Sequence, residues 1–138
     1  MYDSILLAVD GSEQSMRAAK EAARLAAAGR ETQVTILHVV QTETSKEALA
    51  GASQVELDLS RRKKTLAAEQ ALQAQQVYYD VKVLYGRPGP AIVEYINGNR
   101  FDLVVIGSRG LNRMEKVMRG SVSQRVLNQT DCSVLIVR

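Results

Sequence analysis

Cysteine, histidine and phenylalanine each occur once in the 138 residues, and tryptophan does not occur. Because Cys132 has no second cysteine to pair with, an internal disulfide is excluded, and one cysteine cannot build a zinc cluster. His38 likewise lacks the partners that nucleophilic or metal catalysis needs, so we expect a neutral, hydrogen-bonded imidazole. The cysteine usage fits a reducing cytoplasm, where we expect the protein to act.

The sequence also lacks a long hydrophobic run and a strong charge of either sign. The first apolar run ends at Asp10, far short of a signal peptide or a membrane span. The net charge of +3 comes from 18 basic and 15 acidic residues, which does not call for nucleic acid or membrane as a partner. The basic run at residues 61–64 has no aromatic ladder beside it and is interpreted as a solvated helix face.

The length and composition are those of one soluble domain covering residues 1–138. Hydrophobic residues make up 46% of the chain and charged residues 24%, which is enough apolar content for a packed core.

Five short runs rich in Val, Ile and Leu are predicted as strands. They cover residues 4–10, 33–40, 77–85, 102–107 and 133–138. Four of them are almost continuously apolar, as in strands covered on both faces. The third alternates apolar and polar residues, so it is placed at an edge of the sheet.

The segments between these runs have helical spacing. Helices are predicted over residues 12–29, 54–76, 90–99 and 121–130. Ser12 is a candidate N-cap and Gly29 a stop for the first helix, whose apolar stripe is predicted to contain Met16, Ala19, Ala22, Ala23 and Ala26. Residues 41–53 are polar and small and are predicted to form a connection.

Strands alternating with helices predict a doubly wound α/β domain: a five-stranded parallel sheet with helices on both faces. The third and fifth strands are expected at opposite edges and the first and fourth side by side at the reversal, and we expect the strand order 3-2-1-4-5. Ligands bind such sheets beyond the carboxyl ends of the strands, where the winding reverses. The loops after the first and fourth strands are the Gly-, Ser- and Asp-rich ones, and we expect both at one crevice.

The loop after the fourth strand reads "GSRGLNRMEKVMRGS", residues 107–121. Gly107 and Gly110 allow a sharp turn and a close backbone approach, and Gly120-Ser121 opens a helix whose free N–H groups suit a phosphate. Ser121 and Ser123 add hydroxyl groups. Countercharge is available from Arg109, Arg113, Lys116 and Arg119. The alternative is purely structural, with glycines that turn the chain and a serine that caps a helix.

Two standard nucleotide motifs are absent. The sequence contains no Gly-Lys-Ser/Thr triplet and no Gly-x-Gly-x-x-Gly after the first strand. A phosphate cradle in this chain would therefore be of another kind.

The spacing of Gly107, Gly110 and Gly120-Ser121 resembles the nucleotide-binding motif of the universal stress protein family, ATP-binding branch. Two residues separate the first two glycines and nine residues lie between the second and third. Further matches are "ILLAVDGSEQS", "LHVV", "DLVVIGSRG" and "CSVLIVR", so the resemblance covers essentially the whole chain. It implies an adenine nucleotide alpha hydrolase-like fold and a homodimer joined through the C-terminal strand, residues 133–138.

The resemblance also implies ATP as the ligand, with Mg²⁺ on its phosphates, and assigns residues to it. Asp10 would lie near the ribose, and Val39 would meet adenine through its backbone. Ala8 stands where some family members carry proline. The remaining implied binding residues are Ile106, Gly107, Arg109, Gly110, Arg113, Gly120, Ser121, Val122 and Ser123.

The expected function is a nucleotide-dependent switch in which ATP orders residues 108–119 and alters a surface that a protein partner recognises. Two alternatives remain. A slow ATPase or phosphotransferase would need a base, for which Asp10 is the only nearby candidate. A ligand-free adaptor would dimerise without holding a nucleotide. Asp10 itself has a structural alternative, which is to accept backbone hydrogen bonds in the turn before the first helix.

Overall fold

The computed structural model describes residues 2–41, 54–108 and 121–138. Strands and helices alternate along the chain, as predicted. In order they are β1 (Ser4–Ala8), α1 (Glu13–Ala28), β2 (Gln33–Val40), α3 (Gln54–Ala74), β3 (Tyr78–Tyr85), α4 (Pro88–Asn97), β4 (Leu103–Gly107), α5 (Ser121–Gln129) and β5 (Ser133–Val137).

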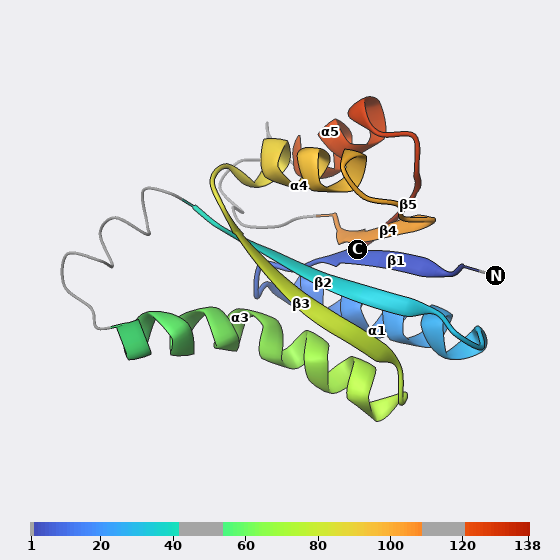
Figure 1. Ribbon diagram of the computed structural model, residues 1–138, viewed down its shortest axis with the longest axis horizontal. Helices are drawn as coiled ribbons and strands as arrows, with labels where there is room; N and C mark the ends of the chain where they lie inside the picture. Colours follow the sequence, from blue (N-terminus) through green and yellow to red (C-terminus); the bar gives the residue numbers. More distant parts are fainter. Residues whose placement is uncertain (1, 42–53, 109–120) are drawn as a thin grey trace.

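All five strands form one parallel sheet in the order β3-β2-β1-β4-β5. Helices α1 and α3 cover one face of the sheet, and α4 and α5 cover the other (Figure 1). The predicted doubly wound α/β fold, its strand order and the edge position of β3 are confirmed. The order reverses between β1 and β4, so the carboxyl ends of these two strands form the switch point.

Two apolar clusters hold the helices on the sheet. On the α1 side the sheet contributes residues such as Ile5, Leu7 and Val105, and on the α4 side residues such as Leu6 and Val104. The part of α1 that is buried consists of small side chains: Ser15, Ala18, Ala19, Ala22, Ala23 and Ala26. Their size lets α1 approach the sheet closely.

Met16 does not belong to the buried stripe of α1, and that part of the prediction is wrong. Its side chain is 42% exposed. The buried stripe instead begins at Ser15, whose hydroxyl group donates to the carbonyl oxygen of Ser12. A polar residue thus takes the position that the apolar spacing assigned to methionine.

Strand β1 ends at Ala8, two residues before the predicted end. Gly11 has a φ of +83°, a conformation that glycine adopts without the steric cost of a side chain. Ser12 then caps α1 as predicted, since its Oγ accepts the N–H of Ser15 at 3.1 Å. The chain therefore leaves the sheet through a short, well-defined turn at residues 9–12.

Helix α3 packs on the β3 side of the sheet around a buried carboxylate, that of Glu69. The Thr65 hydroxyl donates to its Oε2 at 3.0 Å, the Tyr79 hydroxyl donates to its Oε1 at 3.2 Å, and the Arg62 guanidinium lies 3.3 Å from Oε1. Both oxygens are thus satisfied, as a buried charge requires.

None of the helices in the described ranges combines the length and apolar character needed to cross a bilayer.

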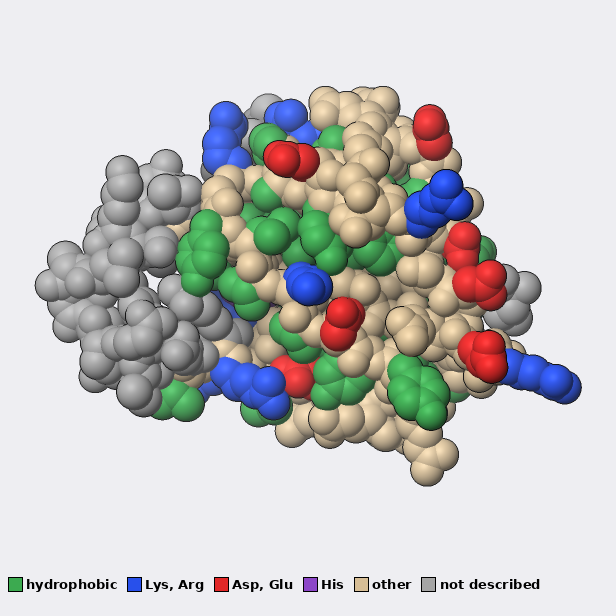
Figure 2. Space-filling model, viewed as in Figure 1, with side chains coloured by type: hydrophobic (Ala, Val, Ile, Leu, Met, Phe, Trp, Pro, Cys, Tyr) green, Lys and Arg blue, Asp and Glu red, His purple; other side chains and the backbone are tan. Residues whose placement is uncertain are grey.

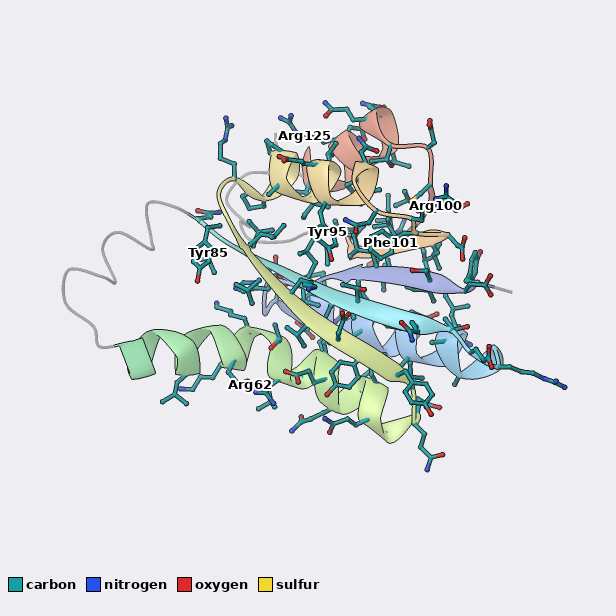
Figure 3. The ribbon with its side chains drawn as sticks, viewed as in Figure 1. Arg62, Tyr85, Tyr95, Arg100, Phe101 and Arg125 are labelled. Atoms are coloured by element: carbon teal, nitrogen blue, oxygen red, sulfur yellow. The ribbon has the colours of Figure 1, made fainter. Side chains whose placement is uncertain are left out.

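Two aromatic side chains fill the space between α4 and β4. Tyr95 and Phe101 lie with their ring centroids 5.9 Å apart, and Figure 3 shows them between α4 and the sheet. Burial and, to a smaller extent, the carboxylate of Asp80 on β3 raise the pKa of the Tyr95 phenol. Tyr95 therefore lies within electrostatic reach of the edge strand.

Candidate functional site

The candidate site lies at the carboxyl ends of β1, β2 and β4. Ala8, Val39 and Ile106 come from these three strands and belong to one buried cluster beneath α4 and α5. Val122, in the first turn of α5, packs against the same cluster. The structure thus brings together four of the residues assigned from the sequence, and they form an apolar floor below the strand ends.

The turn after β1 presents Asp10 at this edge. Its Oδ1 accepts the N–H of Ser12 at 2.8 Å, and its own N–H points to the Ser15 hydroxyl at 3.4 Å. These contacts are the structural role that the sequence left open for Asp10. They also hold a half-buried carboxyl group in one orientation beside the switch point.

The backbone hydrogen-bond ladder between β1 and β2 ends before Val39, the next residue of β2 in position to bond to β1. Odd-numbered residues of β2 bond to β1: the N–H of Gln33 donates to Asp3, and the carbonyl of Leu37 accepts the N–H of Val9 at 2.9 Å. Val39 would be next, yet no backbone hydrogen bond joins it to Val9 in the described chain. Its N–H and C=O groups therefore point beyond the end of β1.

His38 lies at this interruption. Its imidazole is buried, as expected, and its Nδ1 donates to the carbonyl oxygen of Val9 at 3.1 Å. The ring thereby supplies the Val9 carbonyl with a partner where the ladder no longer does. The sequence showed a lone histidine in a strand but carried no signal for this contact, which depends on the side-chain direction at the end of β2.

Gly107 is the last residue of β4, and it does not turn the chain. Among the described glycines only Gly11 and Gly86 have a positive φ. A Cβ on Gly107 would lie 2.9 Å from the Cβ and 3.0 Å from the carbonyl carbon of Gln14, in the first turn of α1. Of the two properties expected of this glycine, close backbone approach applies and a left-handed turn does not.

Helix α5 begins on the side of the sheet where the strands end (Figure 1). Ser123 is buried, and Val122 and Val126 anchor the helix on the apolar floor. The first-turn N–H groups of a helix have no partners within it and carry the positive end of its dipole. Arg109, Gly110, Arg113, Lys116, Arg119 and Gly120, all assigned from the sequence, lie outside the described residues.

Lys64 is a neighbour of the site that sequence reasoning missed. Arg62, Lys63 and Lys64 are exposed, as the solvated-face interpretation expects. The Lys64 side chain nevertheless runs along Gly11, since a Cβ there would lie 2.8 Å from Lys64 Cδ and 3.6 Å from its Nζ. An ammonium group from α3 thus stands beside the turn that carries Asp10, because α3 packs against α1.

Cys132 has the surroundings of a packing residue rather than a reactive thiol. Burial, followed by the charges of Asp102 and Asp131, raises the pKa of its thiol, so the thiolate is disfavoured at neutral pH. In the described ranges, no three His, Cys, Asp or Glu side chains gather closely enough to hold a metal ion.

Replacing Gly107 with alanine is expected to lower the free energy of unfolding by about 1–3 kcal/mol, because the new methyl group overlaps the backbone of α1. Denaturant unfolding measures the change. Gly98→Ala is the comparison: Gly98 also has a negative φ, but a Cβ there would lie 3.3 Å from its nearest neighbour, the Glu94 carbonyl oxygen, so a smaller loss of stability is expected. Equal stability of wild type and Gly107→Ala would refute the packing explanation.

Comparison with known proteins agrees with this architecture. The Universal stress protein family profile matches residues 1–138. A universal stress protein of Thermus aquaticus is 36% identical over 142 residues, and universal stress protein YxiE of Bacillus subtilis is 31% identical over 154 residues, each alignment covering all of both chains. A universal stress protein solved in complex with cAMP is 25% identical with a TM-score of 0.71, over 99% of this chain and 97% of that one. The chain therefore belongs to the universal stress protein family.

Proposed function

We propose that this protein binds an adenine nucleotide, ATP, at the carboxyl ends of β1, β2 and β4 and acts as a nucleotide-dependent regulator in a stress response. The observation that carries the proposal is the broken ladder at Val39, whose backbone donor and acceptor face the switch point. A structural relative that holds cAMP supports an adenine nucleotide as the ligand.

The backbone of Val39 is the proposed adenine contact. An N–H donor and a C=O acceptor on one residue match the adenine edge, which presents an acceptor ring nitrogen beside the exocyclic amino donor. The side chain of Val39 is buried with Ala8 and Ile106, so the backbone is held rigidly. The neighbouring His38 supplies the Val9 carbonyl with the partner that the Val39 N–H does not.

Asp10 is the proposed ribose contact. A carboxylate accepts hydrogen bonds from sugar hydroxyl groups, and such charge-assisted bonds are stronger than neutral ones. Ser12 orients the carboxyl group through Oδ1. The resulting geometry needs no rearrangement of the turn when a ligand enters.

The phosphates are assigned to the glycine motif and the start of α5. Gly107 and Gly110 would line the path, and Gly120, Ser121, Val122 and Ser123 would hold the phosphates at the helix dipole. Arg109 and Arg113 would neutralise the charge, which Mg²⁺ on the triphosphate would reduce further. Ordering of residues 108–119 by ATP stays a prediction, and all of these residues except Ser108 lie outside the described ranges.

The variant Asp10→Asn is expected to weaken ATP binding about tenfold or more, because it removes the carboxylate charge but keeps the oxygen that accepts the Ser12 N–H. Titration calorimetry gives the dissociation constant, and Asp80→Asn on the exposed edge of β3 is the control. Unchanged affinity would remove Asp10 from the site. Sustained Mg²⁺-dependent ATP turnover that is lost in Asp10→Asn would instead identify a slow ATPase.

Gly120→Val is expected to abolish ATP binding while the domain remains folded, because a branched side chain at this motif position blocks backbone approach to a phosphate. Binding is measured with a fluorescent ATP analogue, and circular dichroism reports folding. Full retention of ATP affinity by a folded Gly120→Val protein would contradict the proposed cradle, and wild-type protein that binds no nucleotide would favour the adaptor alternative.

We also propose a homodimer through the C-terminal strand, residues 133–138. Strand β5 is an edge strand with an apolar sequence, and Ile136 is 38% exposed. Unpaired edge groups of this kind are protected by pairing with a second strand, and pairing with a copy gives a two-fold dimer.

Ile136→Lys is expected to shift this dimer towards the monomer, because it places like charges at a self-paired edge. Sedimentation velocity over a concentration series measures the mass. Leu127→Lys, on the exposed side of α5, makes the same chemical change away from the edge and should leave the mass unchanged. A mass distribution that is the same for Ile136→Lys and wild type over the whole concentration series would exclude the β5 contact.

A further inference from the structure

Strand β3 forms the other edge of the sheet, and its outward hydrogen-bonding groups can be assigned. The N–H of Gly86 donates to the carbonyl of Val40 at 2.9 Å, so the even-numbered residues of β3 bond to β2. The backbone groups of Tyr79, Val81 and Val83 therefore point away from the sheet. No other strand of the described chain pairs with this edge.

The β3 edge is long and mostly uncharged. It spans eight residues, Tyr78–Tyr85, of which Tyr78 is 74% exposed and Tyr85 is 53% exposed. Figure 2 views the molecule from this side and shows hydrophobic side chains interspersed with isolated charges of both signs. In Figure 3, Tyr85 lies at the carboxyl end of the strand.

We propose that β3 pairs antiparallel with β3 of a second copy of this chain, with the two-fold axis at Val81. Hydrogen-bonded pairs must then join outward-facing residues, and in this register Val81 meets its own copy and Tyr79 meets Val83 of the partner subunit. The pairing covers residues 78–84 of both strands. It adds a contact at the edge opposite β5 and is independent of the nucleotide site.

Charge selects this register. It places Asp80 directly opposite Lys82 of the partner subunit, twice by symmetry, in non-hydrogen-bonded pairs where side chains approach most closely. Moving the axis by one residue would place Asp80 opposite its own copy in one direction and Lys82 opposite its own copy in the other. The hydrogen-bonding pattern excludes registers that pair odd-numbered with even-numbered residues. Among the registers that remain, like-charge repulsion disfavours the two with the axis one residue away, and the opposite charges favour the axis at Val81.

The same register pairs apolar surface. Tyr78, the most exposed large hydrophobic residue among those described, lies opposite Leu84 of the partner subunit. Leu84 is half-buried and packs on the α4 side of the sheet, so the tyrosine ring would extend that apolar surface. An aromatic ring against an aliphatic side chain is a favourable cross-strand pair.

A charge exchange tests the proposal. Lys82→Asp and Asp80→Lys each create two like-charge pairs and are expected to raise the dissociation constant of the β3 contact about tenfold. The double variant Asp80→Lys/Lys82→Asp restores opposite charges and should recover wild-type association. Sedimentation equilibrium measures the dissociation constant in an Ile136→Lys background, in which association through β5 is weakened. The measurement is repeated in the wild-type background.

Lys20→Asp, an identical charge change at an exposed position of α1, is the matched control and should leave association unchanged. The proposal is overturned if the Ile136→Lys protein and both charge variants in that background associate equally. It is also overturned if the Ile136→Lys protein stays monomeric at all concentrations. Loss of association in the single variants without recovery in the double variant overturns the charge-paired register.

Disulfide trapping tests the register directly in a Cys132→Ser background. A chain carrying Tyr78→Cys, mixed with a chain carrying Leu84→Cys, is expected to form a mixed disulfide, because directly opposed non-hydrogen-bonded positions suit disulfide geometry. Each chain alone should not cross-link, since identical positions lie about 20 Å apart along the paired strands. Cross-linking of either chain alone as efficiently as the mixture overturns the register.

Discussion

The position at which β1 stops is the constraint on which the rest of this structure depends. β1 is the central strand, with β2 and β4 on its two sides, and Ile5, Leu6 and Leu7 are completely buried. Because both neighbours take their register from it, the end of β1 decides where backbone groups of the adjacent strands lose their partners. The His38–Val9 hydrogen bond lies at that end, next to the proposed adenine contact.

The turn after β1 joins this constraint to the helices. The Ser12 N–H donates to Asp10 Oδ1 while the Ser12 Oγ caps α1, so the proposed ribose contact and the start of the helix are one unit. Gly107 lets the first turn of α1 lie directly against the end of β4. The two sides of the switch point are thus held together by backbone packing as well as by the sheet.

The edge position of β3 was predictable from its own residues, whereas the apolar sequence of β5 does not show that this strand is the other edge. Continuous apolar runs mark strands covered on both faces, and the alternation from Val77 to Tyr85 marks an edge. The failures concern contacts between distant segments. Spacing alone placed Met16 in the buried stripe. It also could not predict that Gln14 lies against Gly107 or that Lys64 lies along Gly11, because these contacts depend on how the helices pack on the sheet.

Only part of the candidate site could be predicted from the sequence. The glycine spacing and the family resemblance indicated its residues, whereas the interrupted hydrogen-bond ladder at Val39 is visible only in the three-dimensional structure. The histidine at that interruption has one further property. A carbonyl oxygen only accepts, so Nδ1 must carry hydrogen. The backbone at the end of β1 therefore decides which ring nitrogen of His38 is the donor.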